Sequence, residues 1–388
     1  MTAKRRPKGT GTIRARNGRQ QAIVRYVDPE TSKYRQRAKT FEGQSEAQSW
    51  ISSEIARIEQ EGPAPATTQT VAGFLTLWLK SREVTSLAPS TQSWYRSAVE
   101  RHIVPVLGQH RVDRLTSAHI DAFLASKSAS GRLDQSGDGL GIASVRRLYV
   151  TLSKAYSYAR RMQIVRSNPL DNVDVPAGPQ SDPTSKVWTM EQISMFQSKV
   201  SDDRLVALWW LAAWTGMRRG ELLGLTWPDI DLPEGVISVR RARVQVDGSP
   251  IDSTPKTRRG RRLVELDDST VAVMRRHRTA QAAERLIAGS AWHRTDHVFV
   301  WQDGRPLRPD WTSRRFDRLV SESDLPRISL HGLRHSHATA LLRAGVHPKI
   351  VQERLGHHSA GYTLDVYSAV LPSMQRDAVD RLSSFLGK

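Results

Sequence analysis

The first forty residues alternate between apolar and polar positions, a period that predicts β-strands rather than helix. Turn sequences interrupt the alternation, with an Asn-Gly pair at 17–18 and Asp-Pro-Glu at 28–30. From Ser45 onward the apolar residues recur at helical intervals instead. Because three strands and one helix enclose only a small core, residues 1–62 are predicted to form a small module. The predicted strands are residues 11–16, 20–26 and 34–40.

A helical pattern occupies residues 68–176, where apolar side chains recur every three to four positions. The Gly- and Ser-rich residues 127–141 predict a loop before the last of these helices, which is predicted over residues 142–162. The Asn-Pro pair at 168–169 is its predicted stop signal. Pro-rich segments at 62–70 and 176–187 are predicted linkers. The predicted helices begin at Val71, Pro89, Thr116 and Ile142.

The remaining residues, 186–388, form the largest predicted domain. Its pattern is again mainly helical, with one predicted strand pair near residues 235–245 and 261–266. The whole pattern therefore predicts a multidomain protein that is mainly α with small β parts. Its predicted order is an N-terminal three-stranded sheet plus helix, a central helical domain, and a mixed α/β C-terminal domain.

The charge of the chain changes this picture, because it indicates a polyanionic partner. There are 58 basic and 39 acidic residues, a net charge of +19, and residues 1–40 hold twelve of the basic residues but only two acidic ones. Such a balance favours DNA or RNA over an anionic membrane. Basic residues also alternate along the predicted strands and would give a basic face suited to a DNA groove; a solvated charged face is the alternative. These residues are Arg14, Arg16, Arg25, Arg35 and Arg37.

Several classes are made improbable by what the sequence lacks. The chain has no cysteine, which excludes disulfides and cysteine-ligated metals. Its start has no apolar segment of the kind that a signal peptide needs, and no run of about eighteen apolar residues predicts a membrane span. We therefore expect a cytoplasmic protein with no membrane partner.

Four segments of the last domain carry residues suited to phosphate chemistry. They are Thr215–Leu222, which contains Arg218; Pro255-Lys256-Thr257; His331-Gly332-Leu333-Arg334-His335; and Leu355-Gly356-His357 with Tyr367 downstream. Attack of a hydroxyl on a phosphodiester builds negative charge on the non-bridging oxygens, and planar guanidinium groups bind such oxygens bidentately. Because His331 and Arg334 are three positions apart, a helix would direct both at one phosphate. Leu333 would then face the core.

In their order and spacing these segments resemble the catalytic signature of the tyrosine recombinase (phage integrase) family. The resemblance implies an arm-type DNA-binding module at 1–62, a SAM-like core-binding domain at 68–176 and a DNA breaking-rejoining catalytic domain at 186–388. It implies that Arg218, His331 and Arg334 hold the scissile phosphate and that Glu221 supports Arg218. Arg219 would be either a DNA contact or a solvated side chain.

The resemblance also assigns the proton and bond transfers. Tyr367 would be the nucleophile, with Tyr362 as the competing candidate. A free phenol has a pKa near 10, so nearby cations and His357 would have to favour its ionised form. Lys256 would protonate the leaving 5′-oxygen, or alternatively contact the phosphate backbone.

The clustered histidines raise the alternative of a metal enzyme. His331 and His335 have a metal-ligand spacing, but no Glu follows His331 and no acidic cluster accompanies them, so neither a metal nor another cofactor is expected. Two alternatives stay open, a non-catalytic DNA-binding regulator and an enzyme like the type IB topoisomerases. His335 and His337 are predicted to be structural or to face DNA.

The implied partners follow from the same resemblance. They are double-stranded DNA at core and arm attachment sites, three further subunits in a homotetramer on DNA, and a host DNA-bending protein and an excision factor. The implied activity is integration and excision of a phage or an integrative plasmid, next to the bacterial nucleoid.

Overall fold

The computed structural model describes residues 11–16, 18–27, 34–61, 67–85, 87–134, 136–178, 187–253, 261–356 and 383. The predicted turn residues at 17 and 28–30 lie outside these ranges. The fold is mainly helical with small sheets, as the hydrophobic pattern predicted. Within the described part of the chain, none of the helices combines the length and the apolar character needed to cross a membrane.

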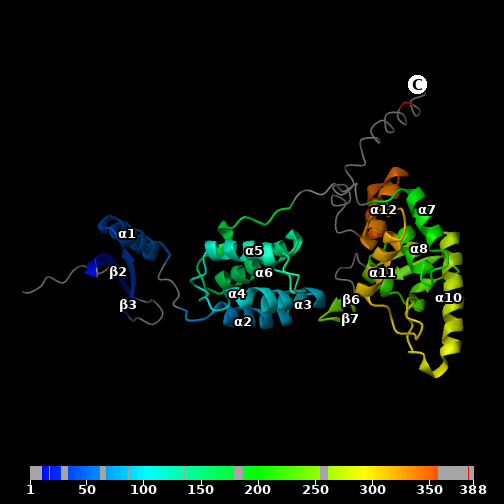
Figure 1. Cartoon of the computed structure of the whole chain (residues 1–388), viewed down its shortest axis with the longest axis horizontal. Coiled ribbons are helices and arrows are strands. Elements are labelled where there is room, and N and C mark those ends of the chain that lie inside the picture. Colours follow the sequence, from blue (N-terminus) through cyan, green and yellow to red (C-terminus); the bar gives the residue numbers. More distant parts are fainter. Residues whose placement is uncertain are drawn as a thin grey trace, which may run out of the picture. The chain divides into compact units, whose positions relative to one another are not determined.

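The N-terminal module is a three-stranded antiparallel sheet covered on one face by a helix (Figure 1). The sheet order is β1-β2-β3, and the strands lie within two residues of their predicted bounds. Alternation along β2 directs Ala22 and Val24 toward the helix, where they pack against Ala47 and Ile51. The elements are β1 (Thr12–Arg16), β2 (Arg19–Val27), β3 (Tyr34–Phe41) and α1 (Gln44–Glu61).

The central helices enclose a separate core in which Trp78 packs on Tyr95 and Phe74 on Tyr156, with ring centroids 5.0 and 6.0 Å apart. The first helix of this domain begins after Thr70, whose hydroxyl caps it by accepting a hydrogen bond from the Gly73 amide. The elements are α2 (Val71–Glu83), α3 (Pro89–Ser97), the π-turn η1 (Ala98–Ile103), α4 (Val104–Leu107), α5 (Ser117–Ser130), α6 (Ile142–Arg161) and the 3₁₀ turn η2 (Pro169–Asn172).

One predicted helix end and one predicted stop signal in this region were wrong. Helix α5 continues to Ser130, inside the predicted loop. Helix α6 ends at Arg161, within one residue of its predicted end at Met162. The residue that breaks the helical path is Gln163, which adopts a left-handed conformation (φ 57°), and not the Asn-Pro pair. Asn168 instead caps the N-terminus of η2, where its side-chain oxygen accepts from the Leu170 amide at 3.1 Å.

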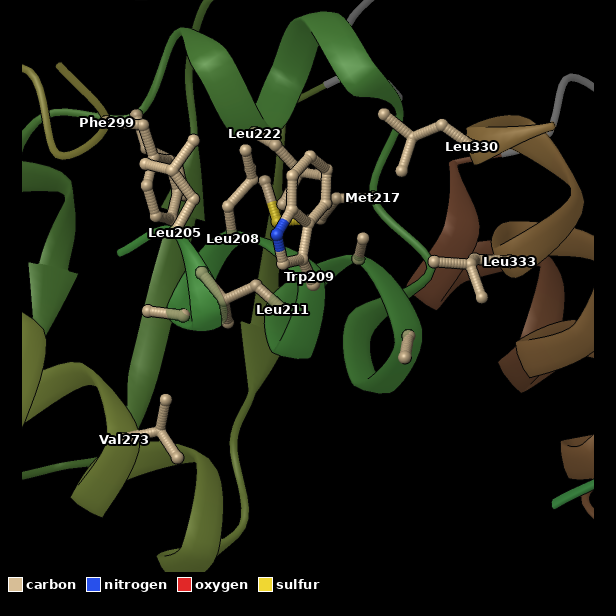
Figure 2. Close-up of a cluster of buried hydrophobic side chains, with 14 of the residues drawn as sticks. Leu205, Leu208, Trp209, Leu211, Met217, Leu222, Val273, Phe299, Leu330 and Leu333 are labelled. Carbon is tan, nitrogen blue, oxygen red and sulfur yellow. The ribbon is translucent and has the colours of Figure 1, made fainter. Parts of the chain in front are cut away.

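The last domain is built around helix α8, which is buried on nearly every side. Figure 2 shows Leu208, Trp209 and Leu211 of this helix among side chains from Leu222, Phe299 and Leu333. A long helix, α10, runs along one side of the domain (Figure 1). The helices are α7 (Met190–Lys199), α8 (Val206–Thr215), α9 (Arg219–Leu223), α10 (Asp268–Ala288), α11 (Pro309–Ser321), α12 (Leu330–Arg343) and α13 (Pro348–Leu355), with short 3₁₀ turns η4 (Trp227–Asp229) and η6 (Gly289–Ala291).

Two small antiparallel sheets complete this domain. The order β4-β5-β8 contains the predicted strand pair, with Ile237 opposite Val264. The hairpin β6-β7 was not predicted, although its Asp247-Gly248 turn has the positive φ angles, 47° and 79°, that such a sequence favours. The strands are β4 (Ile230–Asp231), β5 (Val236–Val239), β6 (Ala242–Val246), β7 (Ser249–Ser253) and β8 (Arg262–Glu265).

Candidate functional site

Three arginines, which we call the arginine set, converge on the carboxyl end of helix α13. The last carbonyls of a helix lack partners within it and carry partial negative charge, so they attract cations. Here three consecutive carbonyls each accept a hydrogen bond from a different arginine, and the three arginines come from three different elements. The pairs are Arg262 Nε to Arg354 O (2.6 Å), Arg334 Nη2 to Leu355 O (2.9 Å) and Arg218 Nη2 to Gly356 O (2.9 Å).

Arg218 lies at the N-cap of α9, directly after the turn that ends α8. The left-handed Gly216 (φ 61°) terminates α8 and allows the chain to turn. The Arg218 main-chain amide donates to Glu221 Oε2, and its Nη1 donates to Oε1, both at 2.8 Å. Its side chain remains 42% exposed. Arg218 is therefore held at both its main chain and its guanidinium, and its side chain is still partly open to a ligand.

Glu221 is a buried carboxylate between two arginines. Burial alone would raise its pKa, but hydrogen bonds and charges from Arg262 and Arg218 outweigh that effect and lower the pKa to about 2. The carboxylate is thus ionised at neutral pH. Glu221 contacts Arg218 on one side and Arg262 on the other.

Arg334 is the most buried member of the set, with 2% of its surface exposed. Its Nη1 donates to Gly216 O at 2.7 Å, in addition to the Nη2 bond to Leu355 O. One guanidinium therefore connects the end of α8 to the end of α13. Leu333, next to it on α12, is fully buried, as the helical pattern predicted.

His331 occupies the first turn of α12, on the face that carries Arg334. Its ring meets that of His335 edge-on, with centroids 4.8 Å apart. Lost hydration, followed by the charges of His335, Arg334 and Arg218, lowers the pKa of His331 to about 4. A neutral imidazole beside the arginine set can accept or donate a hydrogen bond at pH 7.

The remaining predicted catalytic residues lie outside the described residues. Lys256 falls in 254–260, and His357, Tyr367 and the rival Tyr362 fall in 357–382. Only their described neighbours in the chain can be placed: β7 ends at Ser253, β8 begins at Arg262, and Gly356 precedes His357.

The histidines and Arg219 divide between the surface and the interior. Arg219 is exposed and donates to Ser313 Oγ at 2.6 Å. His337 is buried, and its Nε2 accepts from Arg354 Nε at 3.2 Å, which gives it a structural place. Within the described ranges, no three His, Asp or Glu side chains come close enough together to hold a metal ion.

Arg262 also belongs to this site, although the sequence did not predict it there. It lies in a run of basic residues, where burial cannot be inferred from residue type. The signal that could have found it is the period of the strand, because Arg262 and Val264 point to the same side of β8. That side is the buried one, since their partners Val239 and Ile237 are both buried.

The basic residues of the N-terminal sheet do not all share one face. Arg14 pairs with Gln21 and Arg25 with Gln36, and both arginines are exposed on the face away from α1. Arg37 lies on the helix side, where its Nη1 meets Glu54 Oε1 of α1 at 2.7 Å. The expectation that it extends the same basic face was therefore wrong. In the backbone ladder Arg16 pairs with Arg19, and Arg35 with Tyr26.

A helical domain followed by an α/β domain with convergent arginines around a buried carboxylate is the arrangement of a DNA strand-transfer enzyme of the tyrosine recombinase class. The sequence comparisons agree: residues 189–374 match the profile described as "Phage integrase family", and residues 70–128 match "Phage integrase, N-terminal SAM-like domain". The chain belongs to the phage integrase family of tyrosine recombinases.

Individual relatives extend the likeness over most of the chain. The ICEBs1 integrase of Bacillus subtilis is 28% identical over 331 residues, which cover 85% of this chain and 87% of the relative. An integrase of Streptomyces ambofaciens is 28% identical over 397 residues, 97% of each chain.

Solved structures show the same fold. The Tn1549 transposon integrase in complex with transposon right end DNA has a TM-score of 0.64 and 21% identity, covering 80% of this chain and all of that one. A lambda integrase dimer bound to a COC′ core site has a TM-score of 0.54 and 19% identity, covering 94% and 96%.

Proposed function

We propose that this protein is a site-specific DNA integrase that cuts and rejoins DNA through a covalent link to Tyr367. The observation that carries the proposal is the convergence of Arg218 and Arg334 on consecutive carbonyls of α13. These contacts lie directly before His357 in the chain, in the segment that leads to Tyr367. Two relatives that match 85% and 97% of this chain are named integrases, which supports the same activity.

The described residues would act as a phosphate clamp. The Arg218 side chain is 42% exposed, and His331 lies near it with a neutral imidazole. Positive groups fixed in advance of the reaction stabilise charge that develops on the non-bridging oxygens, and they cost no reorganisation at that moment. Arg334 would complete the clamp while holding the ends of α8 and α13 together.

The bond changes balance without metal or ATP. The Tyr367 oxygen would bond to phosphorus while the bond from phosphorus to the 5′-oxygen breaks, leaving a 3′-phosphotyrosine and a free 5′-hydroxyl. Lys256 would protonate that leaving oxygen, and His357 would help to accept the tyrosine proton. Attack by a 5′-hydroxyl from a partner duplex then reverses the first step and releases Tyr367.

The wider assembly is part of the proposal. The central and last domains would hold a core site and the N-terminal module separate arm sites. Four subunits would complete strand exchange; a lambda integrase tetramer bound to a Holliday junction is one of the solved structures with this fold. We place the protein in the bacterial cytoplasm at the nucleoid, encoded by a phage or an integrative plasmid, with a host DNA-bending protein and an excision factor as accessory partners.

Covalent trapping tests the reaction directly. DNA flanking the gene, where such elements carry their attachment site, would be nicked next to each candidate scissile phosphate so that the short cleaved strand diffuses away. The full-length protein would be incubated with this DNA in EDTA and the mixture separated on a denaturing gel. The wild type, Tyr367→Phe and Tyr362→Phe would be compared.

A protein–DNA adduct in the wild type and Tyr362→Phe, but not in Tyr367→Phe, is the expected result. An adduct that persists in Tyr367→Phe would overturn the choice of nucleophile. Tight binding to the attachment DNA without any adduct would favour a DNA-binding regulator. Relaxation of supercoiled plasmids that lack the site, without joining of two duplexes, would favour a topoisomerase.

A further inference from the structure

Arg262 closes a ring of hydrogen bonds around Arg218. Glu221 accepts from Arg218 Nη1 at 2.8 Å and from Arg262 Nη1 and Nη2 at 3.2 and 2.9 Å. Arg262 Nε donates to Arg354 O at 2.6 Å, and Arg218 Nη2 donates to Gly356 O at 2.9 Å. The end of α13 completes the circuit. Arg218 is thus held by two partners, Glu221 and the end of α13, and Arg262 donates hydrogen bonds to both of them.

The exposure of the two arginines differs sharply. The Arg262 side chain is 7% exposed, while that of Arg218 is 42% exposed. Each of the three nitrogens of the Arg262 guanidinium already donates to Glu221 or to Arg354 O. Arg262 is therefore directed into the protein, and Arg218 is the member of the ring that can reach a phosphate.

We propose that Arg262 is a positioning residue for the strand-transfer reaction, acting on the phosphate through Arg218 without touching DNA. This inference rests on the proposed integrase function. Arg262 shares the charge of Glu221, so that Arg218 is not the sole counter-ion of a buried carboxylate. It also fixes the end of α13, whose Gly356 carbonyl orients the other side of the Arg218 guanidinium.

Lysine cannot replace Arg262 in this ring. The planar fork of arginine meets both oxygens of Glu221 while its Nε reaches a carbonyl in another direction. An ammonium group carries the same charge at a single point and cannot span the carboxylate and Arg354 O together. With Arg262→Lys, Arg218 would turn toward Glu221 and away from a bound phosphate.

The test separates binding from chemistry with the full-length protein and nicked core-site DNA. Affinity would be measured by fluorescence anisotropy and adduct formation by single-turnover kinetics for Arg262→Lys and Arg262→Met. We expect the dissociation constant to stay within about threefold of the wild type, because the side chain is buried. The cleavage rate should fall by about 100-fold, the scale of a small misplacement in a reacting site.

A substrate with a methylphosphonate at the scissile position provides the discriminating readout. In it a methyl group replaces one non-bridging oxygen, so that the linkage is uncharged and depends less on Arg218. The rate deficit of Arg262→Lys should shrink on this substrate, in parallel with that of Arg218→Ala. A purely structural defect would persist. A double-mutant cycle with Glu221→Gln should be non-additive, because the two residues act as one unit.

Arg285→Met is the matched control, since it removes the same charge from an exposed position on α10. It should cleave like the wild type. If the wild type forms an adduct and Arg262→Lys cleaves at the same rate, the positioning role is refuted while the integrase function stands. A loss of affinity that accounts for the whole deficit, or no recovery with methylphosphonate, would also refute it. Absence of any wild-type adduct would refute the integrase function itself.

Discussion

The guanidinium of Arg334 donates to the carbonyl of Leu355 across 2.9 Å, while its other terminal nitrogen reaches Gly216 O. A residue predicted to bind phosphate thus also ties the ends of two helices together. Arg218 contributes less to holding helix ends together, because its side chain is far more exposed than that of Arg334. The two arginines should therefore respond differently to the same substitution.

Arg334→Lys is expected to lose both activity and stability. Lysine cannot make both carbonyl contacts, and a lost hydrogen bond to a buried charged group costs about 1.5–3 kcal/mol. Arg218→Lys should lose activity but cost less than about 1 kcal/mol, because the site is partly solvated. Urea unfolding of both variants beside single-turnover cleavage would check this. Equal stability losses would contradict the division of tasks.

Gly216→Ala should destabilise the site. The added Cβ would lie 2.5 Å from Leu355 Cδ2 and 2.8 Å from His337 Cδ2, at a backbone φ of 61°. Overpacking and left-handed strain together cost about 2–4 kcal/mol. Gly248→Ala is the matched control, because it has a φ of 79° but nothing within 4 Å of the new atom. Similar unfolding midpoints for the two variants would show that the contacts with Leu355 and His337 relax freely.

Acid should destabilise the last domain through His337. Burial, followed by the charge of Arg354, lowers the pKa of His337 from 6.5 to about 3. The unfolded chain therefore binds this proton first, so the contribution of neutral His337 is complete above pH 6.5 and is lost progressively as the pH falls toward 3. The slope approaches about 1.4 kcal/mol per pH unit for one proton.

Unfolding free energies at several pH values would test that slope. His337→Gln, whose amide keeps a donor and an acceptor, should lie below the wild type at pH 7.5 and approach it near pH 4.5. His331 contributes in the same direction in both proteins, because its pKa is also lowered. Parallel curves for the two proteins would remove His337 as the source.

The N-terminal sheet gives a prediction about salt. Arg14→Ala and Arg25→Ala should each lower the magnitude of the slope of log affinity against log salt for arm DNA by about 1, as expected for one lost phosphate contact. Arg37→Ala should leave the slope unchanged and instead destabilise the module, because Arg37 pairs with the largely buried Glu54. A reduced slope for Arg37→Ala would place that residue on DNA.

Much of the fold could be predicted from local patterns in the sequence. Alternation and turn residues located the three N-terminal strands, and helical periodicity located α2, α6 and the Leu333 face of α12. The end of α6 was predicted to within one residue, but its predicted stop signal, the Asn-Pro pair, was wrong, because Gln163, not glycine or proline, breaks the helix. Glutamine is not a residue type that predicts a left-handed conformation.

The site was only partly predictable for a different physical reason. The residue types of Arg218, His331 and Arg334 match phosphate chemistry, so motif and spacing were enough to select them. Arg262 has the same residue type as its exposed neighbours, and its partners are a carboxylate and a main-chain oxygen. Its role appears only when the strand and the helix end are placed in space.

The acceptors at the end of α13 are main-chain oxygens, and a substitution of side chains leaves such atoms in place. Sequence drift along this helix therefore spares the three contacts as long as the helix keeps its length and its left-handed Gly356. A proline or an inserted residue, by contrast, would shift all three carbonyls together. The contacts of the arginine set therefore do not depend on which side chains α13 carries, and only a change in the path of its backbone would break them.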